Sequence, residues 1–278
     1  MKSRCSGWIG RLALTCAVAA STFLAACQTV QTTQSGAVGI DRKQSMLVSA
    51  EQINQSAVQA YRQVLQEEGK RGAVNRDADQ LKRVRAIAAR LIPATGAFRA
   101  DAPGWKWEVN VISSKDVNAW CMPGGKIAVY TGLIERIKPS DDELAAVMGH
   151  EIAHALREHG RERASQATGQ SVAAGVIGAA LGMGSLGTDL TSTVLNITFG
   201  LPNSRLHETE ADRIGVELAA RAGYDPHASV TLWQKMGQLG GGQPPQFLST
   251  HPSNETRQQD LQVYAQRVMP LYEQARKK

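Results

Sequence analysis

Three residues, His150, Glu151 and His154, stand within five positions of one another and could share one piece of chemistry. On an α-helix, residues four apart lie one above the other, so both imidazoles can bind one ion while Glu151 projects beside them. A catalytic zinc binds neutral imidazole nitrogens and keeps one position for water, whose proton a nearby carboxylate can accept. The pattern predicts a hydrolytic site with one Zn²⁺ per chain and Glu151 as general base. Two ordinary helix histidines are the alternative.

The sequence around this motif indicates that it lies on a helix. Ser140 and Glu143 have the spacing of a capping box, so a helix is expected to begin there. Apolar positions then follow at helical spacing and form a stripe: Leu144, Met148, Ile152 and Ala155. Gly149 has no side chain and should allow a second backbone to pack closely. The motif is therefore predicted to lie on a capped helix beside another element.

A second predicted helix offers the third ligand that two imidazoles require. It runs from Asn203 to Gly223, where a glycine suits a C-terminal cap. Glu208 and Asp212 are four residues apart and share one face, whereas Glu210 is expected to point elsewhere. A carboxylate from such a helix commonly completes a site of this kind. The spacing alone leaves open which of the two binds.

A different zinc motif, with a glycine and a third histidine after the first two, is not present. Arg157 stands where the glycine should be, and His159 comes one residue early. His159 is therefore expected either to support a ligand from behind or to be exposed.

The start of the chain reads as a targeting segment. Residues 1–26 carry three basic residues and then an uncharged, mainly apolar stretch. Leu24-Ala25-Ala26-Cys27 resembles the lipobox of bacterial lipoproteins, in which the cysteine becomes the acylated N-terminus; a plain signal peptide is the alternative. Gln28, rather than aspartate, favours the outer membrane of a Gram-negative bacterium. The expected product is lipid-anchored on the periplasmic side, with the membrane contacted through that lipid.

Charge and cysteine content exclude several classes of protein. Loss of residues 1–26 lowers the formal charge of +6 by three, which is not the balance of a nucleic-acid-binding protein. Only Cys121 then remains besides Cys27, so the fold cannot depend on internal disulfides. Cys121 is expected to be buried and structural.

The remaining chain is predicted to form one domain behind a tether. Residues 27–44 are polar and poor in large apolar residues, which indicates a flexible tether. Residues 45–278 form the domain. Helical periodicity covers 45–68 and 81–91, and the period changes to two at 105–111. Strands are expected on both sides of Pro123-Gly124-Gly125. The predicted class is α+β, mainly helical, with a small antiparallel sheet beside the motif helix.

Two further segments leave alternatives open. Residues 164–188 are uncharged and rich in small residues, which fits a helical hairpin or lid, or a loop that touches membrane or substrate. His251 follows the glycine- and proline-rich run 240–245, where a loop could swing. From the sequence alone, His251 is either a surface histidine or a residue of the site.

At these residues the chain resembles a zinc metallopeptidase family that includes the CAAX prenyl protease, HtpX, mitochondrial Oma-type proteases, BepA and LoiP. The matching segments are Asn118 to Gly125, His150 to His159, Ser204-Arg205 with Glu208 to Asp212, and His251-Pro252 with Arg257. The chain looks most similar to the small lipoprotein members such as LoiP, without the repeat domain of BepA or the membrane spans of HtpX. The family implies a zincin-like metallopeptidase domain.

The resemblance also assigns roles to residues. It implies that Glu208 is the third zinc ligand and that Asp212 accepts a hydrogen bond from a ligating imidazole. It implies an edge strand that binds substrate, carried by Asn118, Ala119, Trp120, Gly124 and Gly125. His251 would then either occupy the open zinc position and hold the enzyme off, or steady the oxyanion with Arg257 nearby.

The expected function is a zinc-dependent endopeptidase that cleaves misfolded or stalled envelope proteins. The expected partners are such unfolded substrates, with the outer-membrane assembly machinery as a further candidate. A lipoprotein chaperone for outer-membrane proteins that rarely cleaves is the alternative. A complete set of two imidazoles, a third ligand and a base favours hydrolysis, because a pure binder needs no base beside a metal.

Overall fold

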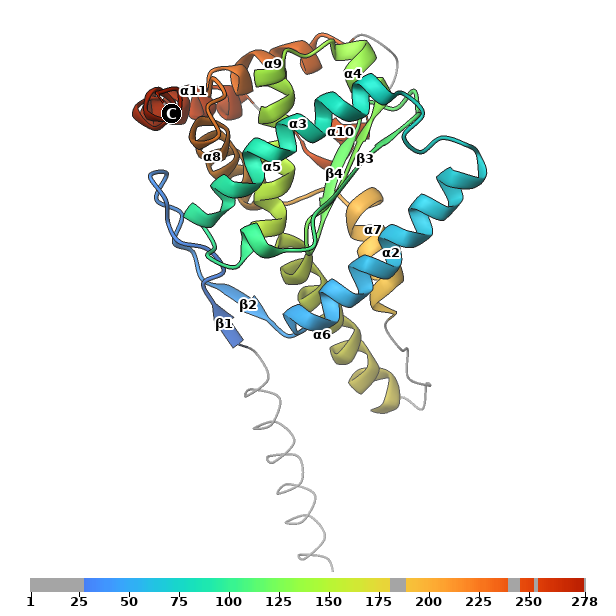
Figure 1. The fold of residues 1–278 in the computed structure, drawn as a ribbon. Coiled ribbons are helices and arrows are strands. Elements are labelled where there is room, and N and C mark those ends of the chain that lie inside the picture. The colour runs from blue at the N-terminus through green and yellow to red at the C-terminus, as the bar shows by residue number, and fades with distance from the viewer. Residues whose placement is uncertain (1–27, 181–188, 240–245, 253–254, 278) are drawn as a thin grey trace, which may run out of the picture.

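The computed structural model describes residues 28–180, 189–239, 246–252 and 255–277 (Figure 1). The strands are β1 (Gln28–Val30), β2 (Gln44–Met46), β3 (Glu108–Ile112), β4 (Ala119–Met122) and β5 (Lys126–Tyr130). The helices are α2 (Ala50–Lys70), α3 (Ala78–Ala94), α4 (Thr131–Ile137), α5 (Asp141–Leu156), α6 (His159–Ala180), α7 (Leu190–Phe199), α8 (Arg205–Arg221), α9 (Ala228–Gly237), α10 (Gln246–Thr250) and α11 (Glu255–Ala275). The predicted mainly helical α+β class is confirmed.

The sheet beside the motif helix is mixed, where an antiparallel sheet was expected. Its strand order is β3-β5-β4, with β3 parallel to β5 and β4 antiparallel to β5. The hairpin turn before β5 uses Gly124 and Gly125 at φ of 77° and 82°, which side chains disfavour. In this hairpin β4 occupies one side of β5, and β3 pairs with the other side. In the described part of the chain, β4 is left at one edge of the sheet.

Helix α5 lies in the middle of the molecule and carries the His150 motif. Ser140 caps it through the predicted capping box with Glu143. It crosses α8 at two glycines: a Cβ on Gly149 would lie 2.9 Å from the carbonyl oxygen of Gly215. A Cβ on Gly215 would lie 2.8 Å from the amide nitrogen of His150. The two backbones can therefore approach closely enough to bring α8 side chains to the motif.

The predicted flexible tether is wrong for residues 28–44, which fold onto the domain. We call residues 28–46 the N-terminal strap. Its strands β1 and β2 pair with each other, and Val38 and Gln44 are 2% and 0% exposed. The Val38 amide donates to Glu217, and Gln44 donates to the Arg157 carbonyl. Composition suggested a tether because the strap is polar, but its polar groups bond to buried partners far away in the sequence.

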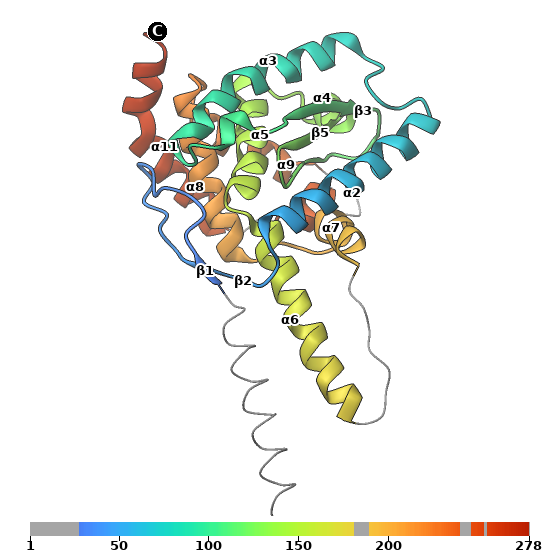
Figure 2. The same cartoon turned by 60° about the horizontal axis from the view of Figure 1, so that its bottom comes forward.

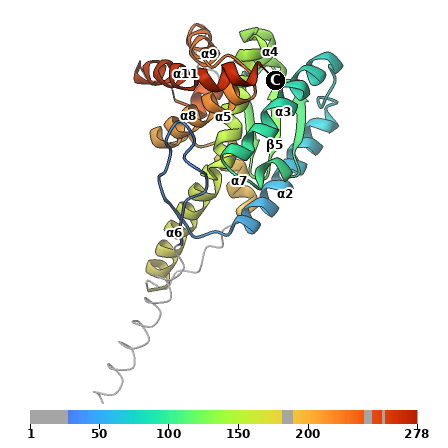
Figure 3. The same ribbon diagram turned by 60° about the vertical axis from the view of Figure 1, so that its left-hand side comes forward.

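Residues 164–180 of the small-residue segment belong to α6, residues 181–188 lie outside the described residues, and α7 follows the segment. Helix α6 projects from the body, as Figures 2 and 3 show, while α7 packs against α2 and approaches β4. None of the helices in the described ranges is both long and apolar enough to cross a membrane.

Candidate metal centre

Four side chains meet where α5 crosses α8. His150 and His154 come from α5, Glu208 from α8, and His251 from the loop after α10. One ligand atom of each lies within 4.8 Å of the others, and all four residues are buried. Ser204 caps α8 by accepting from the His207 amide, so Glu208 stands in the first turn of its helix.

The donor atoms have the spacing that a tetrahedral ion requires. His150 Nε2 and His154 Nε2 are 3.1 Å apart, and they lie 3.5 and 3.3 Å from the two Glu208 carboxylate oxygens. Ligands bound at 2.0–2.1 Å around a tetrahedral zinc are roughly 3.3 Å apart. His150 Nδ1 lies 2.9 Å from Asp212 Oδ1, which favours a proton on Nδ1 and leaves the lone pair of Nε2 facing His154 Nε2. The donor set therefore fits a divalent cation.

Asp212 and Arg257 support the ligands from the far side. Asp212 Oδ1 lies 2.9 Å from His150 Nδ1, so the carboxylate orients that imidazole. Arg257 contacts both Asp212 Oδ2, at 2.7 Å, and Glu208 Oε2, at 2.9 Å. Its guanidinium also lies 3.5 Å above the ring of Trp233. Arg257 thus balances the charge of two buried carboxylates.

The local environment suits the roles of base and ligands. Burial raises the pKa of Glu151, which makes the carboxylate readier to accept a proton. Burial also holds the pKa of His154 well below its usual value, so the imidazole stays neutral as a ligand must. Burial opposes the charge of Glu208, but the His251 and His150 imidazoles outweigh it and keep that pKa well below its usual value.

His251 is a residue of the site and not a surface histidine. It is 5% exposed, and its Nδ1 lies 2.9 Å from Glu208 Oε1 and 3.2 Å from His150 Nε2. Its Nε2 lies 3.4 Å from Glu151 Oε1. The ring stacks on Phe247 at a centroid distance of 4.4 Å. The preceding run 240–245 lies outside the described residues.

His159 lies behind the ligands and is buried, so its exposed alternative is excluded. Its Nδ1 is 2.9 Å from His154 Nδ1, and its Nε2 is 2.9 Å from Glu210 Oε2. Burial lowers the pKa of His159 to about 4, so the ring is neutral near neutral pH. Glu210 points away from the metal ligands, as expected from the helical spacing.

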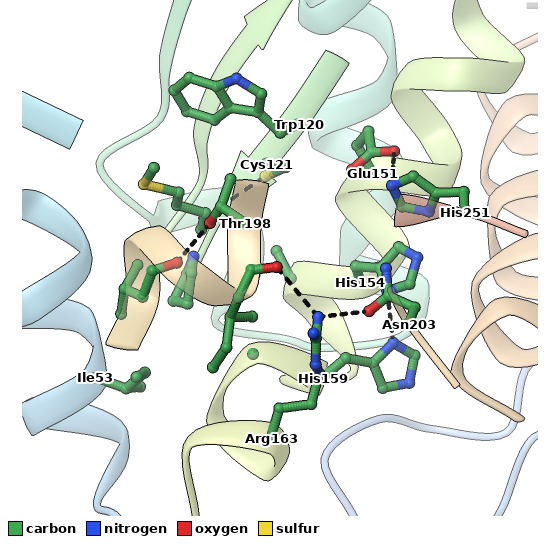
Figure 4. Close-up of a pocket in the computed structure, with 16 residues that line it drawn as sticks. Ile53, Trp120, Cys121, Glu151, His154, His159, Arg163, Thr198, Asn203 and His251 are labelled. Carbon is green, nitrogen blue, oxygen red and sulfur yellow. Dashed lines mark hydrogen bonds and ion pairs between the residues drawn. The ribbon is translucent and has the colours of Figure 1, made fainter. Parts of the chain in front are cut away.

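A pocket opens beside Glu151 and His154, between β4 and α7 (Figure 4). Trp120 and Cys121 line it from β4, and Thr198 faces them from α7. Its remaining lining includes apolar side chains and two polar ones: Ile53, Val194, Ile197, Arg163 and Asn203. All four side chains of β4 are buried, because α5 and α7 pack beside the strand. The predicted substrate strand therefore lies at the wall of a covered cleft, and Cys121 is buried and free.

Several supporting residues had no signal in the sequence. The strap residue Arg42 contacts Glu210 and Glu162, which are 168 and 120 positions away. Phe247 beneath His251 and Trp233 beneath Arg257 resemble ordinary core aromatics in their helices. Only the three-dimensional structure joins these residues to the metal centre.

Comparisons with known proteins agree with this geometry. The sequence model of peptidase family M48 matches residues 78–265. Mitochondrial metalloendopeptidase OMA1 of Schizosaccharomyces pombe is 35% identical over 76% of this chain and 60% of its own length. The Arabidopsis thaliana protein of that name is 42% identical over 55% of this chain and 30% of its own. The Escherichia coli beta-barrel assembly-enhancing protease is 28% identical over 59% and 36%. The chain thus spans between about a third and three fifths of these relatives.

These comparisons contradict the predicted outer-membrane location. The relatives at 35% and 42% identity are named mitochondrial, whereas the bacterial relative is 28% identical. Residues 1–26 and Cys27 lie outside the described residues, so acylation of Cys27 stays a prediction.

The family match covers more than half of the chain and includes both helices that supply the predicted metal ligands. The matched residues also contain Glu151 and Asp212. The predicted relation to Oma-type and BepA-type metallopeptidases is confirmed, and this chain belongs to peptidase family M48.

Proposed function

We propose that the protein is a zinc-dependent endopeptidase that cleaves unfolded or misfolded polypeptide segments. One observation carries the proposal: His150, His154 and Glu208 converge at tetrahedral spacing with the buried carboxylate of Glu151 beside them. A zinc ion held by these three residues would supply Lewis-acid chemistry, polarising the peptide carbonyl and lowering the pKa of a bound water. The family and the names of the relatives support a metalloendopeptidase.

Glu151 is the proton carrier in this proposal. Its pKa is raised by burial, so the carboxylate accepts the proton from the attacking water and can return it to the leaving amine. Asp212 and Arg257 hold the ligands without touching the peptide, because they lie behind His150 and Glu208. These roles separate metal binding from proton transfer.

The pocket and β4 support extended, unfolded substrates. β4 has β5 as its one strand neighbour among the described residues, so its other edge can pair with an extended peptide through backbone hydrogen bonds. The pocket beside Glu151 has a mixed lining, and its apolar side chains, which include Ile53 and Trp120, can contact an apolar side chain next to the cleaved bond. A folded substrate cannot supply such a segment. Helix α7 has to move aside for a peptide to reach the strand.

The position of His251 supports the proposal that the resting enzyme cleaves only weakly. Its ring lies among the ligand atoms, where the attacking water would otherwise stand. A substrate or partner that draws the loop away would release the site. The same position favours, as a second function, a protein that binds unfolded chains and cleaves them rarely.

The substrate proposal can be tested with one small domain in two forms, a stable parent and a destabilised variant of nearly the same sequence. We expect cleavage of the unfolded form only, loss of cleavage with a zinc chelator, and recovery when zinc is restored. Equal cleavage of both forms would remove the proposed preference. Binding of the unfolded form without any cleavage would favour the second function.

A further inference from the structure

His154 is the one predicted histidine ligand without a carboxylate directly behind it. His150 has Asp212 at 2.9 Å from its Nδ1. His154 instead has the imidazole of His159, with 2.9 Å between the two Nδ1 atoms. His159 is 1% exposed and its other nitrogen, Nε2, lies 2.9 Å from Glu210 Oε2. The imidazole of His159 thus lies between His154 and the carboxylate of Glu210.

The positions of the ring protons on His154 and His159 follow from cation binding at His154 Nε2. His154 faces Glu208 and His150 through Nε2, so its proton must be on Nδ1 when Nε2 binds a cation. That N–H donates to His159 Nδ1, which must then be the acceptor nitrogen. The proton of His159 is left on Nε2, where it donates to Glu210. His159 then accepts one hydrogen bond from His154 and donates one to Glu210, so a single tautomer of each ring satisfies both contacts.

Two arginines hold Glu210, the carboxylate behind His159, in place. Arg157 is fully buried and donates to both carboxylate oxygens of Glu210 at 3.2 Å. Arg42, from the N-terminal strap, donates to Glu210 Oε1 at 2.7 Å and to Glu162 Oε1 at 2.7 Å. The ring of His159 also stacks on His207 at a centroid distance of 4.3 Å. Glu210 and the His159 ring therefore have little freedom to turn.

We propose that His159 and Glu210 are positioning residues that fix the orientation and tautomer of the metal ligand His154, and that Arg42 of the N-terminal strap holds this relay in place. The relay gives His154 the support that Asp212 gives His150. It also makes the metal centre depend on the segment that precedes the domain. The inference rests on the metal site of the proposed function, and it concerns zinc affinity and not cleavage.

The test compares zinc affinity in four variants and the wild type, by competition with a chromophoric chelator and without peptide. His159→Leu removes the acceptor for His154 and should weaken zinc binding about 10–100-fold. His159→Gln keeps an acceptor and a donor on one side chain and should recover most of that loss. Arg42→Gln should weaken binding by less than His159→Leu, because Arg157 still holds Glu210.

The matched control is Glu217→Gln. Glu217 is buried on the same helix as Glu210 and accepts from the strap amide of Val38, but it lies two turns away and does not contact His159. It should lose stability while keeping wild-type zinc affinity. Thermal unfolding of every variant without metal separates a general loss of fold from a loss at the site. The absorption spectrum of the Co²⁺-substituted protein should change in His159→Leu and not in the control.

The relay would be overturned if His159→Leu bound zinc as tightly as the wild type, or if Glu217→Gln lost as much affinity. If Arg42→Gln bound zinc as tightly as the control Glu217→Gln, the proposed role of the strap would be overturned. A wild-type protein that binds zinc but cleaves no peptide would instead contradict the proposed function and leave the inference about the relay unaffected. The two failures are therefore distinguishable.

Discussion

Replacing His251 by alanine separates the two roles that this residue could have. In the structure its ring is 5% exposed, stacks on Phe247, and lies 2.9 Å from Glu208 and 3.4 Å from Glu151. For the loop to leave, the hydrogen bond to the charged Glu208 must break, which costs about 1.5–3 kcal/mol. At about 1.4 kcal/mol for each factor of ten, the closed site outnumbers the open one by roughly 10–150 to one. His251→Ala should raise basal kcat/KM by about that factor.

The assay is cleavage of a short fluorogenic peptide with zinc in excess. The control is His227→Ala, because His227 is a half-exposed histidine at the start of α9 that contacts Asp225. It should cleave like the wild type. If His251 steadied the oxyanion, His251→Ala would instead lower kcat about 10²–10³-fold. Either that loss or an unchanged rate would refute the reasoning, because only a blocking residue raises the rate when it is removed.

Three other predictions concern the structure around the site. Arg257→Met should lower the free energy of unfolding by about 3–5 kcal/mol and weaken zinc binding, because Glu208 and Asp212 lose their buried cation; denaturant titration and chelator competition measure both. Gly149→Ala should destabilise the protein by about 1–3 kcal/mol by forcing α5 from α8, whereas Gly169→Ala in α6, which meets open space, should not. The zinc-free protein should lose stability as the pH falls from 6.5 through 4, since the folded state holds His159 neutral with a pKa of about 4; a flat pH profile of unfolding would contradict this.

The parts of the site that the sequence predicted are those that local rules determine. The capping box at Ser140 places α5, and the four-residue spacing brings His150 and His154 to one face. Gly149 was expected to admit a second backbone, and it does so at Gly215 of α8. Helical periodicity on α8 indicated a third ligand, and resemblance to the family was needed to prefer Glu208 to Asp212.

The parts that the sequence could not predict depend on contacts between distant residues. Arg42 contacts Glu210, which is 168 positions away in the sequence, and no local periodicity indicates such a contact. The same contacts explain why residues 28–44 read as a tether: their polar side chains lack helical or strand periodicity but bond to buried groups such as Arg157. The mixed sheet was likewise missed because strand order is a matter of topology and not of composition.

The central claim, that Glu151 is the base of a zinc site formed by His150, His154 and Glu208, is tested most directly by the Glu151→Gln variant. The variant and the wild type are measured side by side for zinc per chain and for digestion of casein. We expect one zinc per chain in both and no digestion by the variant, because the amide cannot accept the proton from water while the ligands remain. A Glu151→Gln protein that still digests casein would contradict the mechanism.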